Sequence, residues 1–174
     1  MSSCRFLSAV LLLATTGLSQ TGPAPQPIPE HVAYQHIFRH LLMLKQKSDD
    51  AQKAGKDRSE LRHLVRKEAG LDEAQGKLLE AAATQCEAEV AEQDAKARVV
   101  INRFRAKFPF GIVPKGAQLP PPPPELAQMQ QERNQIILLA RDQLRNVLGE
   151  EGFAKLDAYV KKASQNATVI TPAH

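Results

Sequence analysis

The feature that most constrains the fold is a run of 35 residues, Glu73 to Lys107, that contains no proline. A helix of that length would span about 50 Å at 1.5 Å per residue. The residues expected to form its contact face, which we call the seam, recur at intervals of three and four: Leu79, Ala82, Cys86, Val90, Gln93, Ala97, Val100 and Phe104. This spacing is typical of the seam of an antiparallel helical hairpin or coiled coil. The small residues allow a second helix to approach closely, and Gln93 is a polar interruption that fixes the register.

A second helical pattern follows and supplies the expected partner for the first. Apolar residues with helical spacing lie between residues 125 and 148: Leu126, Met129, Ile136, Ile137, Ala140, Leu144 and Val147. Arg133 interrupts this stripe. The two segments are therefore expected to pair with each other.

Between the two patterns lies "FPFGIVPKGAQLPPPPPEL", residues 108–126. Pro109 and Pro114 end the first helix, and five prolines would extend about 15 Å before the second. Pro124 suits the first position of that helix, where a missing N–H costs little. We expect residues 108–124 to form a stiffened connection between antiparallel helices. Phe110, Ile112 and Val113 would then cap the hairpin end or, if exposed, form a docking loop.

Shorter helices are expected on both sides of this hairpin. Before it, the residues Ala33, Tyr34, Ile37, Phe38, Leu41, Leu42 and Leu44 form one broad apolar face. Asp57 with Glu60 matches a capping box for a second helix, whose apolar residues would be Leu61, Leu64, Val65 and Ala69. Gly70 is placed for its C-terminal cap, and Asp72 with Gln75 repeats the capping box for the long helix.

After the hairpin, Gly149 separates a last helix whose apolar face would contain Phe153, Leu156 and Val160. Taken together, the patterns predict an all-α protein. It would be a long antiparallel helical hairpin or a small helical bundle with a proline-rich connecting loop.

The N-terminus predicts export. Arg5 precedes an apolar run from Phe6 to Ala14, as in a secretory signal peptide over residues 1–20. Residues 21–29 alternate proline with small or polar residues and would form a tether. A single helical domain is expected over 30–164 and a flexible tail over 165–174. The mature protein would lie in the periplasm or outside the cell, with no stable insertion in the membrane.

The two cysteines limit covalent stabilisation. Cys4 precedes the apolar run instead of following it, so we reject a lipid anchor. After signal cleavage Cys86 is the only cysteine, and no intramolecular disulfide can form. Cys86 is interpreted as a small residue of the helical core.

Charge and motifs exclude several function classes. Without the signal peptide the chain has 22 basic and 19 acidic side chains, with the two signs interleaved, which does not favour nucleic acid as a partner. No nucleophile elbow, zinc-protease motif, phosphate loop or dinucleotide fingerprint is present. We therefore expect a non-enzymatic protein without a cofactor.

Two candidate sites remain in the sequence. Arg98, Arg103 and Arg105 lie close to Phe104 and Phe108, and this mixture of basic and apolar side chains would bind partly unfolded acidic proteins. His36 and His40 are four residues apart on one helical face and form an alternative, metal-binding site. Arg39 and Lys47 on the same face would repel a metal ion.

The segment "GLDEAQGKLL" carries a resemblance. Leu71 and Gln75 match the Leu and Gln of the L-T-x-x-Q motif found in periplasmic proteins of the Spy and CpxP type, and Asp72 replaces its Thr with an equally good N-cap. Leu148 occupies the place of a second copy, where Gly149 and Gly152 replace the Thr and Gln. The resemblance implies an all-helical dimer that shields unfolded clients without ATP, or a metal-responsive relative.

Three functions follow as hypotheses. The preferred one is an exported binding protein that acts as an ATP-independent chaperone or stress protein on protein clients. The alternatives are a periplasmic metal-binding or metal-sensing protein, and a structural or assembly protein that docks through its helical seam or proline loop. Partner helices and a homodimer are compatible with all three.

Overall fold

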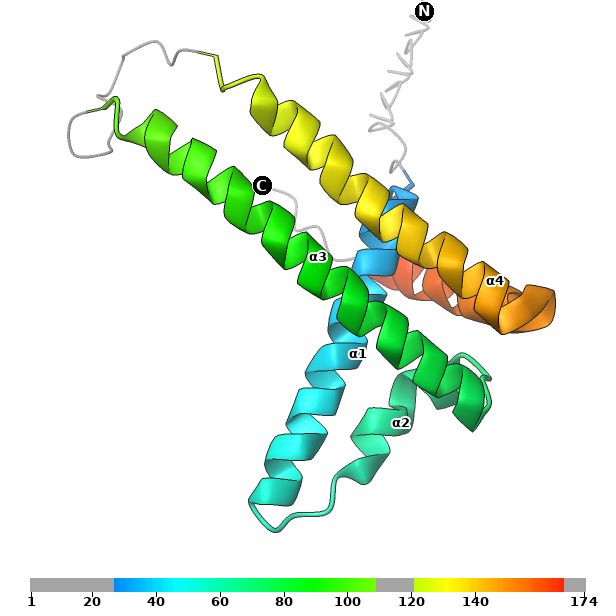
Figure 1. Ribbon diagram of the computed structural model, residues 1–174. Coiled ribbons are helices and arrows are strands. Elements are labelled where there is room, and N and C mark those ends of the chain that lie inside the picture. Colours follow the sequence, from blue (N-terminus) through cyan, green and yellow to red (C-terminus); the bar gives the residue numbers. More distant parts are fainter. Residues whose placement is uncertain (1–26, 109–120, 168–174) are drawn as a thin grey trace, which may run out of the picture.

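The computed structural model describes residues 27–108 and 121–167, and these residues form helices without strands (Figure 1). The helices are α1 (Glu30–Lys53), α2 (Ser59–Glu68), α3 (Glu73–Arg105) and α4 (Glu125–Ala167). The all-α prediction is confirmed. None of the described helices combines the length and apolar character needed to cross a membrane.

The long hairpin is formed by α3 and the first part of α4, which lie side by side and antiparallel (Figure 1). The predicted seam is buried at Leu79, Cys86, Val90, Gln93 and Val100. Ala82, Ala97 and Phe104 are half-buried. The spacing of three and four residues therefore correctly predicted the face of α3 that packs against α4.

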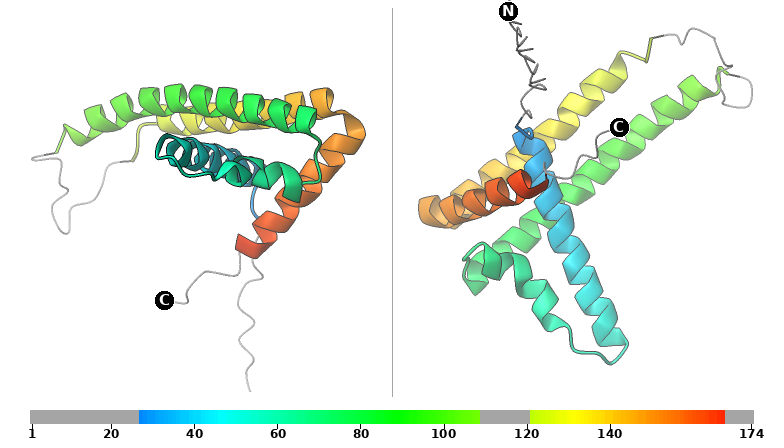
Figure 2. Two further views of the ribbon diagram at one scale, coloured as in Figure 1. Left: turned by 90° about the horizontal axis from the view of Figure 1, so that it is seen from below. Right: turned by 180° about the vertical axis from the view of Figure 1, so that it is seen from behind.

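A break at Gly149 divides α4 into two helical segments. Its backbone has φ 69° and ψ 172°, which interrupts an otherwise helical run, as the sequence predicted. Only glycine adopts this region without strain. The segment after Gly149 folds back beneath the hairpin and packs against the start of α1 (Figure 2).

A second, shorter hairpin is formed by α1 and α2 and lies as a layer on one side of α3 and α4 (Figure 2). Gly70, with φ 67°, closes α2: Leu71 N donates to Arg66 O and Gly70 N donates to Lys67 O. These two bonds form a Schellman motif, so the predicted glycine cap is confirmed. The turn directs the chain straight into α3.

The start of α3 has the predicted capping box. Gln75 N donates to Asp72 Oδ1 at 2.8 Å, and Asp72 N donates to Gln75 Oε1 at 3.0 Å. The corresponding prediction for α2 was wrong. Arg58 occupies the N-cap position without a side-chain cap, while Asp57 accepts a bond from Ser59 N, because the helix begins one residue later than a box with Glu60 requires.

The core lies where α1, α3 and both segments of α4 meet. Its largest fully buried side chains include Tyr34, Phe38, Leu79, Ile137, Leu144 and Leu156. Two side chains predicted for apolar faces are instead exposed. Leu64 is 36% exposed and Val147 is 54% exposed, because no other helix covers those sides of α2 and α4.

The far part of the hairpin extends beyond this core. We call residues 94–108 and 121–136 the arm, and the remaining described residues the body. In the described part of the arm, only Val100 is buried. The arm is a pair of helices whose apolar seam has little cover from the other helices.

Candidate functional site

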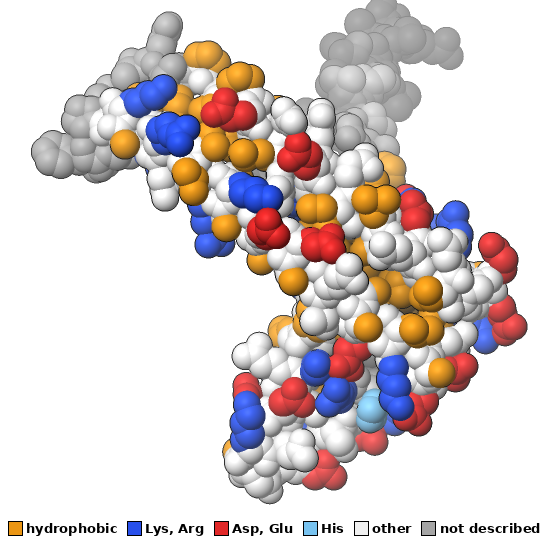
Figure 3. Space-filling model, viewed as in Figure 1, with side chains coloured by type: hydrophobic (Ala, Val, Ile, Leu, Met, Phe, Trp, Pro, Cys, Tyr) orange, Lys and Arg blue, Asp and Glu red, His pale blue; other side chains and the backbone are white. Residues whose placement is uncertain are grey.

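The end of the arm carries an excess of positive charge. From Lys96 to Phe108 the sequence has five basic residues and no acidic one. Arg98, Arg103 and Arg105 are exposed, and none of them forms an ion pair within the described residues. Figure 3 shows basic side chains beside apolar ones at this end of the molecule. The three predicted arginines are thus accessible to a partner.

The two predicted phenylalanines lie against each other, close in sequence to these arginines. The ring centroids of Phe104 and Phe108 are 5.4 Å apart, with an angle of 74° between the planes. Lys107 Nζ lies 6.0 Å from the centroid of Phe104, close enough for a cation–π contact. Both phenylalanines are half-buried. They are therefore neither core residues nor fully exposed ones, and part of each ring remains available.

The predicted docking residues Phe110, Ile112 and Val113 lie outside the described residues, as do the signal peptide and most of the proline-rich connection.

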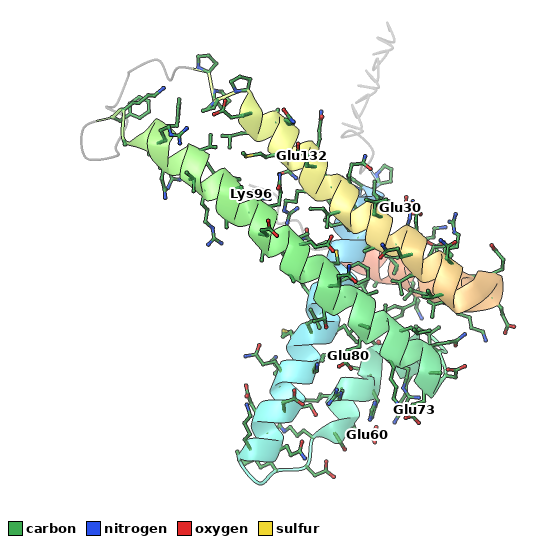
Figure 4. The ribbon with its side chains drawn as sticks, in the orientation of Figure 1. Glu30, Glu60, Glu73, Glu80, Lys96 and Glu132 are labelled. Atoms are coloured by element: carbon green, nitrogen blue, oxygen red, sulfur yellow. The ribbon has the colours of Figure 1, made fainter. Side chains whose placement is uncertain are left out.

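A polar layer marks the boundary between the arm and the body. Gln93 Nε2 donates to Glu132 Oε2 at 2.7 Å, and Arg133 Nε donates to Asp94 Oδ1 at 2.9 Å. Glu132 lies on the first part of α4 (Figure 4). Gln93 is only 7% exposed. The residue predicted to fix the register between the helices thus has a specific partner on α4.

The two histidines of the metal hypothesis lie on the outer side of α1. His36 is exposed and His40 is half-buried. Arg39, between them in sequence, donates to Glu87 at 3.0 Å. Within residues 27–108 and 121–167, no group of three or more His, Cys, Asp and Glu side chains is arranged to hold a metal ion. The described residues supply no further ligand to this pair.

Cys86 lies in the seam between α3 and the rest of the body. Burial, with smaller effects of Glu87 and Glu89, raises the pKa of the thiol to about 11. The side chain is 1% exposed. At neutral pH it is a protonated thiol in the core, which matches the predicted role and makes it a poor nucleophile.

The two segments that carry the resemblance lie against each other. A Cβ added to Gly152 would come within 2.5 Å of Gln75 Nε2 and 3.2 Å of Leu148 Cβ. Gly152 therefore leaves room for the side chain that completes the capping box of α3. The turn of α4 and the start of α3 are thus in close contact at this point.

Sequence reasoning missed a groove between α1, α2 and α3, which we call the α1–α3 groove. It is a cavity of about 830 Å³ whose lining includes Leu41, Asp49, Arg62, Arg66, Leu79 and Glu80. Arg62 Nη2 lies 2.9 Å from Glu80 Oε1, and its Nη1 lies 3.6 Å from Asp49 Oδ1. Because these residues come from three helices, no single sequence window contains the groove.

Comparison of this chain with protein-family models, with curated proteins and with solved structures finds no match. Function must therefore be argued from the surfaces themselves.

Proposed function

We propose that this protein is an exported, non-enzymatic binding protein that uses the arm to hold partly unfolded acidic proteins, as an ATP-independent chaperone does. The observation that carries the proposal is the unpaired charge of Arg98, Arg103 and Arg105 beside the partly accessible rings of Phe104 and Phe108. Charge attracts an acidic client from a distance, and the rings supply apolar contact after the encounter.

The shape of the arm supports this use. It extends away from the body, so a client can contact both of its helices without displacing the core (Figure 2). Its seam residues Leu126 and Met129 are half-buried. Binding a client would cover this apolar area and remove it from water, which is favourable.

Light scattering of an acidic client, unfolded by reduction of its disulfides, tests the proposal. We expect the purified protein at equimolar ratio to suppress aggregation of that client. A basic client of similar size should be protected much less. Unchanged scattering of the acidic client would contradict the proposal.

A charge-matched pair of variants locates the activity. The triple variant Arg98→Gln, Arg103→Gln, Arg105→Gln removes three positive charges from the arm. The control Lys47→Gln, Lys56→Gln, Arg58→Gln removes three exposed charges from α1 and from the connection between α1 and α2, at another corner of the molecule (Figure 1). We expect only the arm variant to lose protection. Equal losses would show that net charge matters and the arm does not.

A further inference from the structure

The α1–α3 groove contains one arginine that the protein itself does not neutralise. The acidic side chains in its wall are Asp49, Glu73 and Glu80. Asp49 and Glu80 form a network with Arg62 and Lys45, with two charges of each sign. Glu73 pairs with Lys77 at 2.8 Å. These contacts balance each other and leave the charge of Arg66 in surplus.

Arg66 has no carboxylate in direct contact, although the charge of Glu73 is near enough to act on it. It forms no ion pair or hydrogen bond within the described residues, and its Nε is buried without an acceptor. Arg62, one turn earlier on the same helix, has two carboxylate partners. A guanidinium group carries five N–H donors, and a donor left without a partner away from water costs free energy. The guanidinium group of Arg66 is therefore able to accept a further anionic partner.

The position of the Arg66 side chain is set by its contact with α3. Its aliphatic stem lies on Gly76, where an added Cβ would come within 2.8 Å of Arg66 Cγ. A glycine at this place in a helix is unfavourable by about 1 kcal/mol relative to alanine, and here it provides space for the arginine. The close approach holds the guanidinium group in the wall of the groove.

The rest of the wall indicates the kind of anion. Ala81 and Ala88 of α3 are exposed and contribute apolar surface, with the buried Leu41 and Leu79 beneath the floor of the groove. One unpaired cation matches a single negative charge, whereas a phosphate group generally needs several cationic or N–H donors. An apolar wall beside one cation fits a ligand with a charged end and an apolar body.

We propose that the α1–α3 groove binds an organic carboxylate with an apolar chain, its carboxylate on the guanidinium Nη atoms of Arg66 and its chain along Ala81 and Ala88 of α3. The C-terminus of a polypeptide and an aliphatic acid share this chemistry. The site is separate from the arm, so it is independent of the proposed chaperone function.

Calorimetric titration of the full chain with octanoate tests the proposal, with octanamide as the neutral control. We expect saturable binding of octanoate, and binding of octanamide weaker by about tenfold, since a hydrogen bond to a charged group is worth about 1.5 kcal/mol or more. Absence of octanoate binding tighter than millimolar, or equal affinities for the two compounds, would overturn the proposal.

Two variants and one control assign the site to Arg66. Arg66→Gln should weaken octanoate binding about tenfold. Gly76→Ala keeps the charge but occupies the space of the arginine stem, so it should also weaken binding, while far-UV circular dichroism shows the helices intact. Lys67→Gln removes one charge from an exposed neighbour outside the groove and should change nothing. Wild-type affinity in Arg66→Gln, or an equal loss in Lys67→Gln, would overturn the proposal.

A second titration distinguishes the two kinds of carboxylate ligand, a polypeptide C-terminus and an aliphatic acid. A short peptide that ends in leucine is compared with its C-terminal amide and with octanoate. Tighter binding of the free peptide than of octanoate would identify a polypeptide C-terminus, and the reverse order would identify an aliphatic acid. Equal binding of the peptide and its amide would contradict recognition of a C-terminal carboxylate by this groove.

Discussion

Helices α3 and α4 run through both the arm and the body, yet the seam between them is buried to different degrees in the two regions. In the body, α1 and the returning segment of α4 cover the hairpin, and Leu79, Leu144 and Leu156 are fully buried. In the arm, two helices face each other with little further cover, and Leu126, Met129 and Phe104 remain half-buried. The same helical periodicity thus produces a core in one region and an accessible apolar surface in the other.

This difference separates stability from binding within one chain. Burial of apolar area drives folding, so the body should supply most of the free energy of unfolding. The arm contributes less and is free to present apolar and basic side chains to a partner. Four measurements test this contrast.

The largest loss of stability is expected for a substitution that creates a cavity in the body. Leu156→Ala should lower the free energy of unfolding by about 3 to 5 kcal/mol, because the side chain is fully buried. Met129→Ala in the arm should cost less than about 1.5 kcal/mol, because its side chain is only half-buried. Urea unfolding followed by circular dichroism measures both. Equal losses would mean that the arm is packed as tightly as the body.

The second-largest loss of stability is expected at the break in α4. Gly149→Ala should destabilise the protein by about 2 kcal/mol, because alanine is strained at φ 69° and ψ 172°. An added Cβ meets nothing within 4 Å, so the cost comes from the backbone alone. Thermal unfolding measures it. No loss of stability would show that the turn which brings the last helical segment onto α1 does not need glycine.

A smaller effect should appear with pH in the seam of the body. Burial raises the pKa of the Cys86 thiol from its ordinary value of 9.0 to about 11. The protonated thiol is therefore favoured by folding, and its contribution, between about 1 and 2 kcal/mol, is complete below pH 9 and lost as pH rises towards 11. Stability curves of the wild type and Cys86→Ala over this range measure the difference. Parallel curves would contradict the assigned burial of the thiol.

The smallest effect is expected at the end of the arm. The triple variant Arg98→Gln, Arg103→Gln, Arg105→Gln should change the free energy of unfolding by less than about 0.5 kcal/mol, because the side chains are exposed and unpaired. Urea unfolding checks this and supplies the control for the aggregation assay. A loss of more than 1 kcal/mol would show that these arginines stabilise the fold and would remove the main argument for their role in binding.

Several parts of the fold could be predicted because they depend on residues close in sequence. The seam of α3 follows from the spacing of its side chains, and the capping box of Asp72 and Gln75 lies within one turn. Gly70 and Gly149 have positive φ, as glycines at helix ends often do. The exposed arginines of the arm were also identified from the sequence, although what they bind remains a prediction.

Other features could not be predicted from local patterns. Leu64 and Val147 fit the apolar faces of their helices but are exposed, because burial depends on whether another helix covers that side. The ion-pair network around Arg62 joins α1, α2 and α3, so neither its members nor the surplus charge of Arg66 is visible in one segment.

Local sequence patterns were enough to predict that the chain is helical, where most of the helices begin and end, and which faces of α3 and α4 pair. These properties follow from backbone preferences and from a repeat of three and four residues, which act over one or two turns. Two further features depend on tertiary packing: one half of the hairpin is covered while the other extends as an arm, and Arg66 lies in a groove without an ion pair. Both depend on how α1, α2 and the end of α4 pack around the hairpin, through contacts between residues far apart in the chain.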